Sequence, residues 1–218
     1  DAGTVTETVQ LINWDEPEKN DFAIAEEVTL KGNQERRPDI VLYVNGIAIG
    51  VLELKNSRVS IGDGIRQNLS NQQPEFNAWF FATVQLLFAG NDSEGLQYGT
   101  IGTLEKYYLK WKEDESDNIR NKLDKYLLKI CEKRRLIELM HDFVLFDGGV
   151  KKLPRVHQYF GIKAAQQHAR ASSSAYAGGV PLQAVPQQAV VTATAVTATA
   201  TGVPVQQQAV GTDSAVTA

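Results

Sequence analysis

Several residue types are scarce in this 218-residue sequence, and each scarcity excludes a class of site. The single cysteine, Cys131, excludes an internal disulfide framework and a cysteine-based zinc cluster. The three histidines, His141, His157 and His168, are too scattered for a metal site or a nucleophile triad. No apolar run approaches the roughly 20 residues that a membrane-spanning helix needs.

An excess of positive charge is also missing. The chain has 22 lysines and arginines against 26 acidic residues, which argues against binding nucleic acid by wholesale neutralisation of phosphates. Any contact with nucleic acid must therefore be local. The first residues show no basic stretch followed by an apolar one, so we expect no secretion signal and a cytoplasmic protein.

The composition predicts three parts. From Ser172 to Ala218 the only charged residue is Asp213, and phenylalanine and tryptophan are absent. We interpret residues 172–218 as a low-complexity tail and assign it no function. The patterns before it predict an organised core at 1–110 and a helical connector at 111–171.

The spacing of apolar residues predicts an α/β fold, with a mixed β-sheet flanked by helices. Asn45-Gly46 is typical of a hairpin turn, and the helical spacing over Ser60–Gln72 predicts a strand–helix–strand crossover. From Asn118 onward we expect two amphipathic helices, and we expect the helices to pack on one side of the sheet. The predicted strands are Val5–Ile12, Phe22–Leu30, Ile40–Val44, Ile47–Leu54, Trp79–Ala89 and Leu96–Ile101.

The chemically distinctive residues lie at the ends of the predicted hairpin. Asp39 opens the first strand, and Glu53 and Lys55 share one face of the second because they are two residues apart. Two neighbouring carboxylates repel each other unless a cation lies between them. Oxygen ligands without a nearby histidine or cysteine favour Mg²⁺, with Mn²⁺ as a substitute. With Lys55 to orient water or stabilise the reacting phosphate, this set indicates phosphodiester hydrolysis.

The register of the hairpin decides whether the two acids meet. A strict two-residue turn would place Asp39 opposite Leu52 and direct Glu53 to the other side of the sheet. We therefore predict either a three-residue loop with Gly46 in the left-handed region or a single β-bulge, for instance at Gly50. Both put Asp39 opposite Glu53.

Each fragment alone has an ordinary explanation. A Glu-x-Lys pattern on a strand is usually a solvated ion pair, and Pro-Asp commonly opens a strand or a turn. Their combination at the ends of apolar strands, followed by a polar helix that carries Arg66 and Gln67, favours a functional site.

These residues resemble the core of PD-(D/E)xK nucleases and, more narrowly, the amino-terminal endonuclease region of the restriction (motor) subunit of type I restriction-modification enzymes. The resemblance runs from about Val5 to Ala169. It is carried most specifically by RRPDIVLYVNG and ELKN, and also by IRQNLSNQQPEF, FFATVQLLFAGND and RVHQYFGIKAA.

The resemblance implies an active site. It places the metal ligands and the catalytic lysine on Asp39, Glu53, the Leu54 carbonyl and Lys55. The supporting glutamine of the family's Gln-x-x-x-Tyr element falls on Gln67, whereas the tyrosine position holds Asn71. Family members also have a helix before the first strand that can supply a further acidic residue, and no segment here matches it.

The resemblance also implies cofactors and partners. The metal would be Mg²⁺, and ATP would serve only the full-length subunit, where Gln158 takes the place of a glutamine that contacts adenine. The pattern G-x-x-x-x-G-K-[S/T] is absent from the sequence, so we expect no ATP hydrolysis by this chain. The implied partners are double-stranded DNA and the modification (methyltransferase) and specificity subunits, with no membrane.

The leading hypothesis is a Mg²⁺-dependent endonuclease module that cuts duplex DNA without reading its sequence. Basic residues flank the acidic pair and can form a local phosphate-binding rim, with Arg37, Arg58 and Arg66 as the main candidates beside Lys31 and Arg36. One alternative is a non-catalytic docking module on the same fold, with its acids paired to arginines. The other is a stand-alone structure-specific nuclease.

Overall fold

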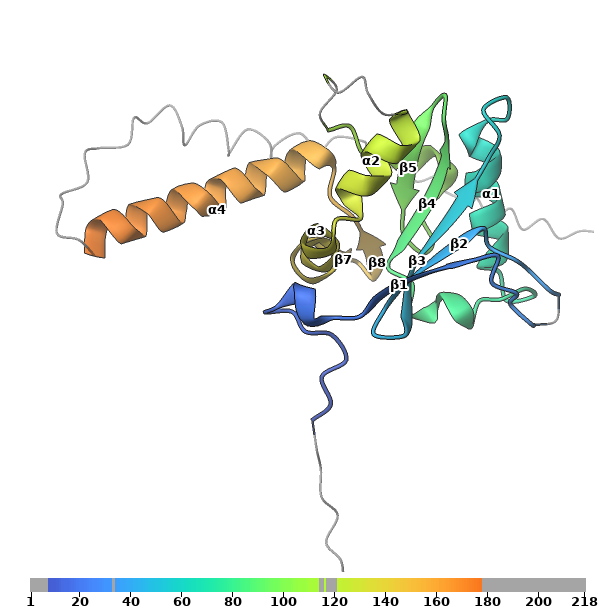
Figure 1. The fold of residues 1–218 in the computed structure, drawn as a ribbon, viewed down its shortest axis with the longest axis horizontal. Helices are drawn as coiled ribbons and strands as arrows, with labels where there is room; N and C mark the ends of the chain where they lie inside the picture. Colours follow the sequence, from blue (N-terminus) through green and yellow to red (C-terminus); the bar gives the residue numbers. More distant parts are fainter. Residues whose placement is uncertain (1–7, 33, 114–115, 117–120, 178–218) are drawn as a thin grey trace, which may run out of the picture. The chain divides into compact units, whose positions relative to one another are not determined.

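A six-stranded sheet with the order β1-β2-β3-β4-β5-β6 forms the centre of the fold (Figure 1). The computed structural model describes residues 8–32, 34–113, 116 and 121–177, and their side chains as far as 172. Neighbouring strands are antiparallel except β3 and β4, which are parallel, so the sheet is mixed. The strands are β1 (Phe22–Glu26), β2 (Ile40–Val44), β3 (Ile47–Leu54), β4 (Leu86–Asn91), β5 (Gly95–Gly99) and β6 (Leu109–Lys110).

Helices and a small hairpin complete the described part of the chain. The α-helices are α1 (Ile61–Asn71), α2 (Lys122–Ile130), α3 (Lys133–Glu138) and α4 (Val156–Ala177). Short helical turns are η1 (Pro17–Lys19), η2 (Phe80–Ala82), η3 (Glu105–Tyr107) and η4 (Leu139–Phe143), and β7 (Leu145–Asp147) pairs with β8 (Val150–Lys152). The chain divides into two units, Asp1–Ala164 and Ala165–Ala218, and the sheet belongs to the first.

Apolar side chains fill both faces of the central sheet. On one face Ile61 and Ile65 of α1 pack with Val51 and Leu87. On the other face α2 and α3 join a larger cluster that contains Leu52. The prediction that the helices pack on one side is therefore wrong. Successive residues of β3 and β4 point to opposite faces, and because both faces are apolar, each needs a cover.

The central hairpin carries a β-bulge, as one of the two alternatives predicted. Asn45 and Gly46 have positive φ values of 51° and 79°, which a tight two-residue turn requires. Pairing next to the turn follows that strict register, and then the register shifts by one because Ile49 is an extra residue on β3. The bulge thus lies one residue before Gly50, and the three-residue loop is not formed.

The strand–helix–strand crossover is confirmed. β3, α1 and β4 follow one another, and β3 pairs with β4 in parallel. The helix is capped by Ser60, whose hydroxyl accepts a hydrogen bond of 3.1 Å from the Gly62 N–H. The bounds of β2 and β3 are those predicted, and α1 lies within the predicted Ser60–Gln72.

Other predicted strands are shorter than expected. The strand predicted over Phe22–Leu30 ends at Glu26, because Glu27 adopts a positive φ of 51° that breaks the extended backbone. The run Trp79–Ala89 first forms η2, and the strand begins only at Leu86. A buried turn and a buried strand share the same apolar composition, so this run does not tell them apart.

The remaining predictions concern segments outside the central crossover. The strand predicted over Val5–Ile12 is wrong for residues 8–12, which have no regular structure, and its first residues lie outside the described part. β6 and the β7–β8 hairpin have no counterpart among the predicted strands. The two amphipathic helices are present as α2 and α3, and α4 continues past 172 to Ala177. The helices of the described part are all too short or too polar to cross a membrane.

Candidate functional site

The shifted register brings Asp39 and Glu53 to one face of the hairpin. Beyond the bulge, Ile40 pairs with Leu52, so the next residues outward, Asp39 and Glu53, lie at the same level. An Asp39 side-chain oxygen, Oδ2, accepts a hydrogen bond of 2.6 Å from the Leu54 N–H. The backbone of β3 therefore holds the Asp39 carboxylate beside Glu53.

Glu53 is fully buried on the strand in the middle of the sheet. Its Oε1 accepts a hydrogen bond of 3.3 Å from Asn71 Nδ2, whereas its Oε2 is buried with no hydrogen-bond partner. Burial above all, with the nearby charge of Asp39, raises the pKa of this carboxyl to about 8 against the opposing charge of Lys55. A buried carboxyl with one open oxygen beside a second carboxylate is an environment that a cation would stabilise.

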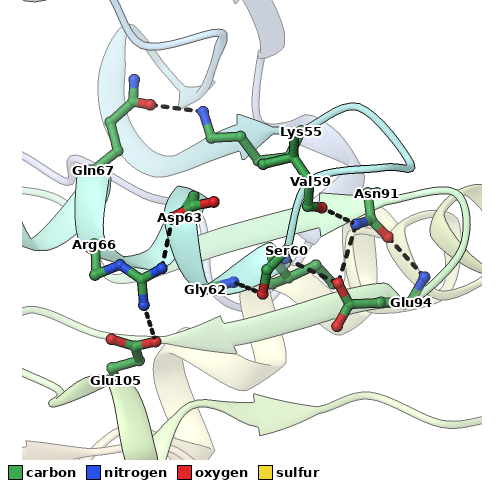
Figure 2. A network of polar contacts seen from close by, with 11 residues as sticks. Lys55, Val59, Ser60, Gly62, Asp63, Arg66, Gln67, Asn91, Glu94 and Glu105 are labelled. Carbon is green, nitrogen blue, oxygen red and sulfur yellow. Dashed lines mark hydrogen bonds and ion pairs between the residues drawn. The ribbon is translucent and has the colours of Figure 1, made fainter.

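Lys55 follows β3 directly and points toward α1. Its Nζ donates a hydrogen bond of 2.6 Å to Gln67 Oε1, as Figure 2 shows. Its backbone N–H donates to the Gly90 carbonyl at 2.9 Å, which fixes the lysine to the end of β4. A Cβ on Gly64 would lie 3.2 Å from the Ala89 Cβ, so this glycine lets α1 approach the sheet closely enough for the contact.

A second group of polar residues holds the loop between Lys55 and α1. Asn91, which is 1% exposed, donates from Nδ2 to the Val59 carbonyl at 2.8 Å (Figure 2). A carboxylate oxygen of Glu94 accepts a hydrogen bond of 3.0 Å from the Ile61 N–H at the start of α1. The sequence does not single out Asn91 and Glu94, because they resemble ordinary turn residues and their partners are about 30 positions away.

Two of the three predicted DNA-contacting arginines are engaged in ion pairs. Arg66 contacts Asp63 and Glu105, each at 2.6 Å (Figure 2), and the resulting hydrogen bonds raise the pKa of its guanidinium. Arg37 pairs with Glu27 at 3.2 Å. All of these side chains are more than two-fifths exposed, so the pairs are surface pairs that phosphates can replace.

Arg58 is the third predicted arginine, and it is exposed on the loop after Lys55. Its backbone N–H donates to Asn56 Oδ1 at 3.0 Å, and its guanidinium forms no ion pair with any residue that the structure describes. The neighbouring candidate Arg36 is used differently, because its guanidinium lies over the Phe76 ring at 4.0 Å from the centroid.

Gln158, the predicted adenine contact, is not brought to the acidic pair. It lies in the first turn of α4, where its Oε1 accepts a hydrogen bond of 2.8 Å from the Arg155 N–H. It also lines a cavity of about 560 Å³ whose walls include Lys151, Lys152 and Tyr107.

The donor set at the acidic pair fits a hard divalent cation. Within the described ranges, no three histidine, cysteine, aspartate or glutamate side chains gather closely enough to hold a metal. Among the described residues, the oxygen ligands available for a metal at this place are Asp39, Glu53 and backbone carbonyls. The N–H and carbonyl of a strand residue face the same neighbour, so the Leu54 carbonyl faces the Asp39 side, to which its N–H donates. The unpartnered Glu53 Oε2 supplies an open ligand atom.

Comparisons with known proteins match this chain to one family. The family model of the type I restriction enzyme R protein N terminus matches residues 1–106. The "Putative type I restriction enzyme MjaVIIIP endonuclease subunit" of Methanocaldococcus jannaschii is 28% identical over 178 residues, which cover 76% of this chain and 16% of that protein. The "Putative type I restriction enzyme MjaIXP endonuclease subunit" of the same organism is 25% identical over 186 residues, with 73% and 18% covered.

A bacterial relative gives the same picture. The "Type I restriction enzyme HindI endonuclease subunit" of Haemophilus influenzae is 23% identical over 174 residues, which cover 73% of this chain and 16% of that protein. The chain thus spans less than a fifth of the length of these relatives. Over residues 1–106, the chain matches the family model of the type I restriction enzyme R protein N terminus.

Proposed function

We propose that this chain is the Mg²⁺-dependent endonuclease module of a type I restriction enzyme R subunit, built on the PD-(D/E)xK fold, that hydrolyses phosphodiester bonds of foreign double-stranded DNA. The observation that carries the proposal is the bulge at Ile49, which brings Asp39 level with Glu53 and leaves Lys55 two residues further along. The names of the three relatives support a restriction enzyme as the context.

Asp39, Glu53 and the Leu54 carbonyl would hold the Mg²⁺. The open Glu53 Oε2 and the raised pKa of the Glu53 carboxyl support this assignment, because both are unfavourable features that a bound cation would remove. When bound, the metal would neutralise phosphate charge and lower the pKa of a coordinated water.

Beside the metal ligands, we assign a role toward the phosphate to Lys55 and a role in positioning Lys55 to Gln67. The hydrogen bond from Lys55 Nζ to Gln67 Oε1 restricts the long lysine side chain and keeps its ammonium group beside the acidic pair. A positioned ammonium group stabilises the negative charge that develops on the phosphate during hydrolysis, and it can orient the attacking water. Gln67 is a positioning residue in this scheme.

Arg37, Arg58 and Arg66 would contact the DNA backbone around the site. Arg58 has the fewest competitors, since it forms no ion pair within the described chain. Arg37 and Arg66 would exchange their exposed acidic partners for phosphates. These contacts carry no sequence information, so a separate specificity subunit would select the DNA, with a modification subunit in the same complex.

ATP would act outside this module. The endonuclease core at 1–110 and the connector at 111–171 would lead into a motor that the chain does not include, and Gln158 would face the adenine there. Gln158 now accepts the Arg155 N–H, so contact with a nucleotide requires it to exchange that hydrogen bond.

The docking-module alternative requires the two acids to be paired with arginines. Asp39 instead contacts the Leu54 N–H and Glu53 contacts Asn71, and neither forms an ion pair with a described arginine. The names of the relatives favour a subunit of a restriction complex over a stand-alone nuclease.

Calorimetric titration with Mn²⁺ and Mg²⁺ tests the metal site without turnover. Binding to the chain should be lost in Asp39→Asn and in Glu53→Gln, and kept in Lys55→Ala. Asp63→Asn is the matched control, because Asp63 is an exposed acid on α1 that pairs with Arg66. Binding that survives both acid substitutions, or no binding in any variant, would overturn the proposed site.

Cleavage is tested in the assembled enzyme. A full-length subunit that carries Lys55→Ala, combined with its modification and specificity subunits, should lose plasmid cleavage and keep ATP hydrolysis. Cleavage at the wild-type rate would overturn the role of Lys55 while leaving the metal site in place.

A further inference from the structure

The face of α1 that packs on the sheet is partly polar. Ile61 and Ile65 are buried in the first half of the helix, whereas Asn68 and Asn71 are buried in the second half, at 0% and 2% exposure. A buried amide destabilises a fold unless it is hydrogen-bonded. The two asparagines therefore need partners on the strands below them.

The partners of the two asparagines differ in kind. Asn68 Nδ2 donates to the Phe88 carbonyl of β4 at 2.9 Å, a contact between a side chain and the backbone. Asn71 Nδ2 instead donates to Glu53 Oε1 at 3.3 Å. The backbone of Asn71 is also fixed, because its carbonyl accepts the Asn77 N–H at 3.3 Å.

The contact from Asn71 makes the two oxygens of Glu53 unequal. Oε1 is occupied by an amide donor, and Oε2 has no partner. An amide that holds one oxygen restricts rotation of the carboxylate and directs the other oxygen to a fixed place. The resemblance expects a tyrosine at this position, yet the asparagine supplies an N–H donor to the acid itself.

We propose that Asn71 is a positioning residue that holds Glu53 Oε1, so that Oε2 alone faces the metal. This inference rests on the proposed function, because it assumes that Glu53 is a metal ligand. Partners that orient a metal-binding side chain commonly contribute roughly 10- to 100-fold to metal affinity.

The experiment is a calorimetric titration of Mn²⁺ into the whole chain and three variants. Asn71→Leu keeps the approximate shape of the side chain and removes the N–H donor. Asn71→Ser shortens the side chain so that it no longer reaches Glu53, with less risk to packing. Asn68→Leu is the matched control, because Asn68 is equally buried on the same helix face but bonds to backbone. Thermal melts of all variants report stability separately.

We expect Mn²⁺ affinity to fall about tenfold or more in both Asn71 variants and to stay within about twofold of wild type in Asn68→Leu. Wild-type affinity in a folded Asn71 variant, or an equal loss in Asn68→Leu, would overturn the role of Asn71 and leave the metal site standing. No binding to the wild-type chain would overturn the metal site itself, and this role with it.

Discussion

The two faces of the central sheet are built on different principles. The face under α2 and α3 is a continuous apolar cluster that includes Trp111, Ile130 and Phe143. The face under α1 is smaller, and it gives up apolar burial for Glu53 and two asparagines. Burying polar and ionisable groups lowers stability, so the first face stabilises the fold and the second is less stable where the proposed site lies.

The largest expected effect is a loss of stability on the apolar face that leaves the site intact. Ile130, the last residue of α2, is fully buried, and Ile130→Ala should lower the free energy of unfolding by about 2–5 kcal/mol because it leaves a cavity. Urea denaturation measures the loss, and Mn²⁺ affinity of the folded variant should be unchanged.

Ile65→Ala is the counterpart on the site face. Ile65 is 2% exposed on α1, and its loss should loosen the helix that carries Gln67 and Asn71, so Mn²⁺ affinity should fall together with stability. If Ile130→Ala lowers Mn²⁺ affinity as much as Ile65→Ala does, the proposed difference between the two faces is wrong.

The next effect concerns the pH dependence of stability in the presence of a chelator. The pKa of Glu53 is about 8 in the folded chain and near 4.5 when exposed, so the unfolded chain releases this proton first. The stability associated with the protonated group is complete below pH 4.5 and is lost as pH rises to about 8. Glu53→Gln removes this loss, so its stability should fall less between these pH values than that of the wild type.

Denaturant midpoints at a series of pH values measure this difference. Equal pH profiles for the wild type and Glu53→Gln would mean that Glu53 titrates as an exposed acid does. Added Mg²⁺ should reduce the wild-type loss at the alkaline end, since a cation favours the ionised carboxylate.

A smaller effect separates two helix caps, one over each face. Ser60 caps α1 through the Gly62 N–H, and Asn121 caps α2 through the Asp124 N–H at 2.8 Å. Substitution of either cap by alanine should cost about 0.5–2 kcal/mol of stability in chemical denaturation. Only Ser60→Ala should also weaken Mn²⁺ binding, because α1 carries the side chains that hold Lys55 and Glu53. A weakening of similar size in Asn121→Ala would mean that Mn²⁺ binding depends on α2 as much as on α1.

The smallest effect on stability is expected at Arg58, which touches neither core cluster. Arg58→Ala should leave the melting temperature almost unchanged and weaken binding to duplex DNA. The slope of log affinity against log salt should become shallower by about 0.9, the value for one lost phosphate contact. Fluorescence anisotropy at several salt concentrations measures the slope. Lys19→Ala, which removes an exposed cation paired with Glu16, is the control and should leave it unchanged.

The predictions that depend on neighbouring residues in the sequence were the accurate ones. The turn at Asn45-Gly46 and the bounds of β2 and β3 follow from local backbone preferences and from alternation. The sequence also favoured a one-residue shift in the hairpin, because only that shift brings the acids together. The shift was predicted as a three-residue loop or as a bulge, for instance at Gly50, and the structure has a bulge at Ile49.

Errors arose where a pattern has two structural solutions. The first part of the run Trp79–Ala89 forms the turn η2. Phe81 and Val84 are buried in this part without belonging to the sheet, so an apolar composition alone did not identify a strand. The placement of helices on both faces depends on which side of β3 and β4 each helix reaches, and amphipathic spacing identifies an apolar side without naming its partner.

The sequence by itself determined the hairpin, the crossover from β3 through α1 to β4 and the candidate residues Asp39, Glu53 and Lys55, because turns and alternation are set by adjacent residues. Only the tertiary structure decided that Glu53 is fully buried, that Asn71 holds one of its oxygens and that the other has no partner. These features depend on contacts between β3 and the far end of α1, 18 residues apart. Packing over such separations sets burial and pKa, and no local pattern encodes it.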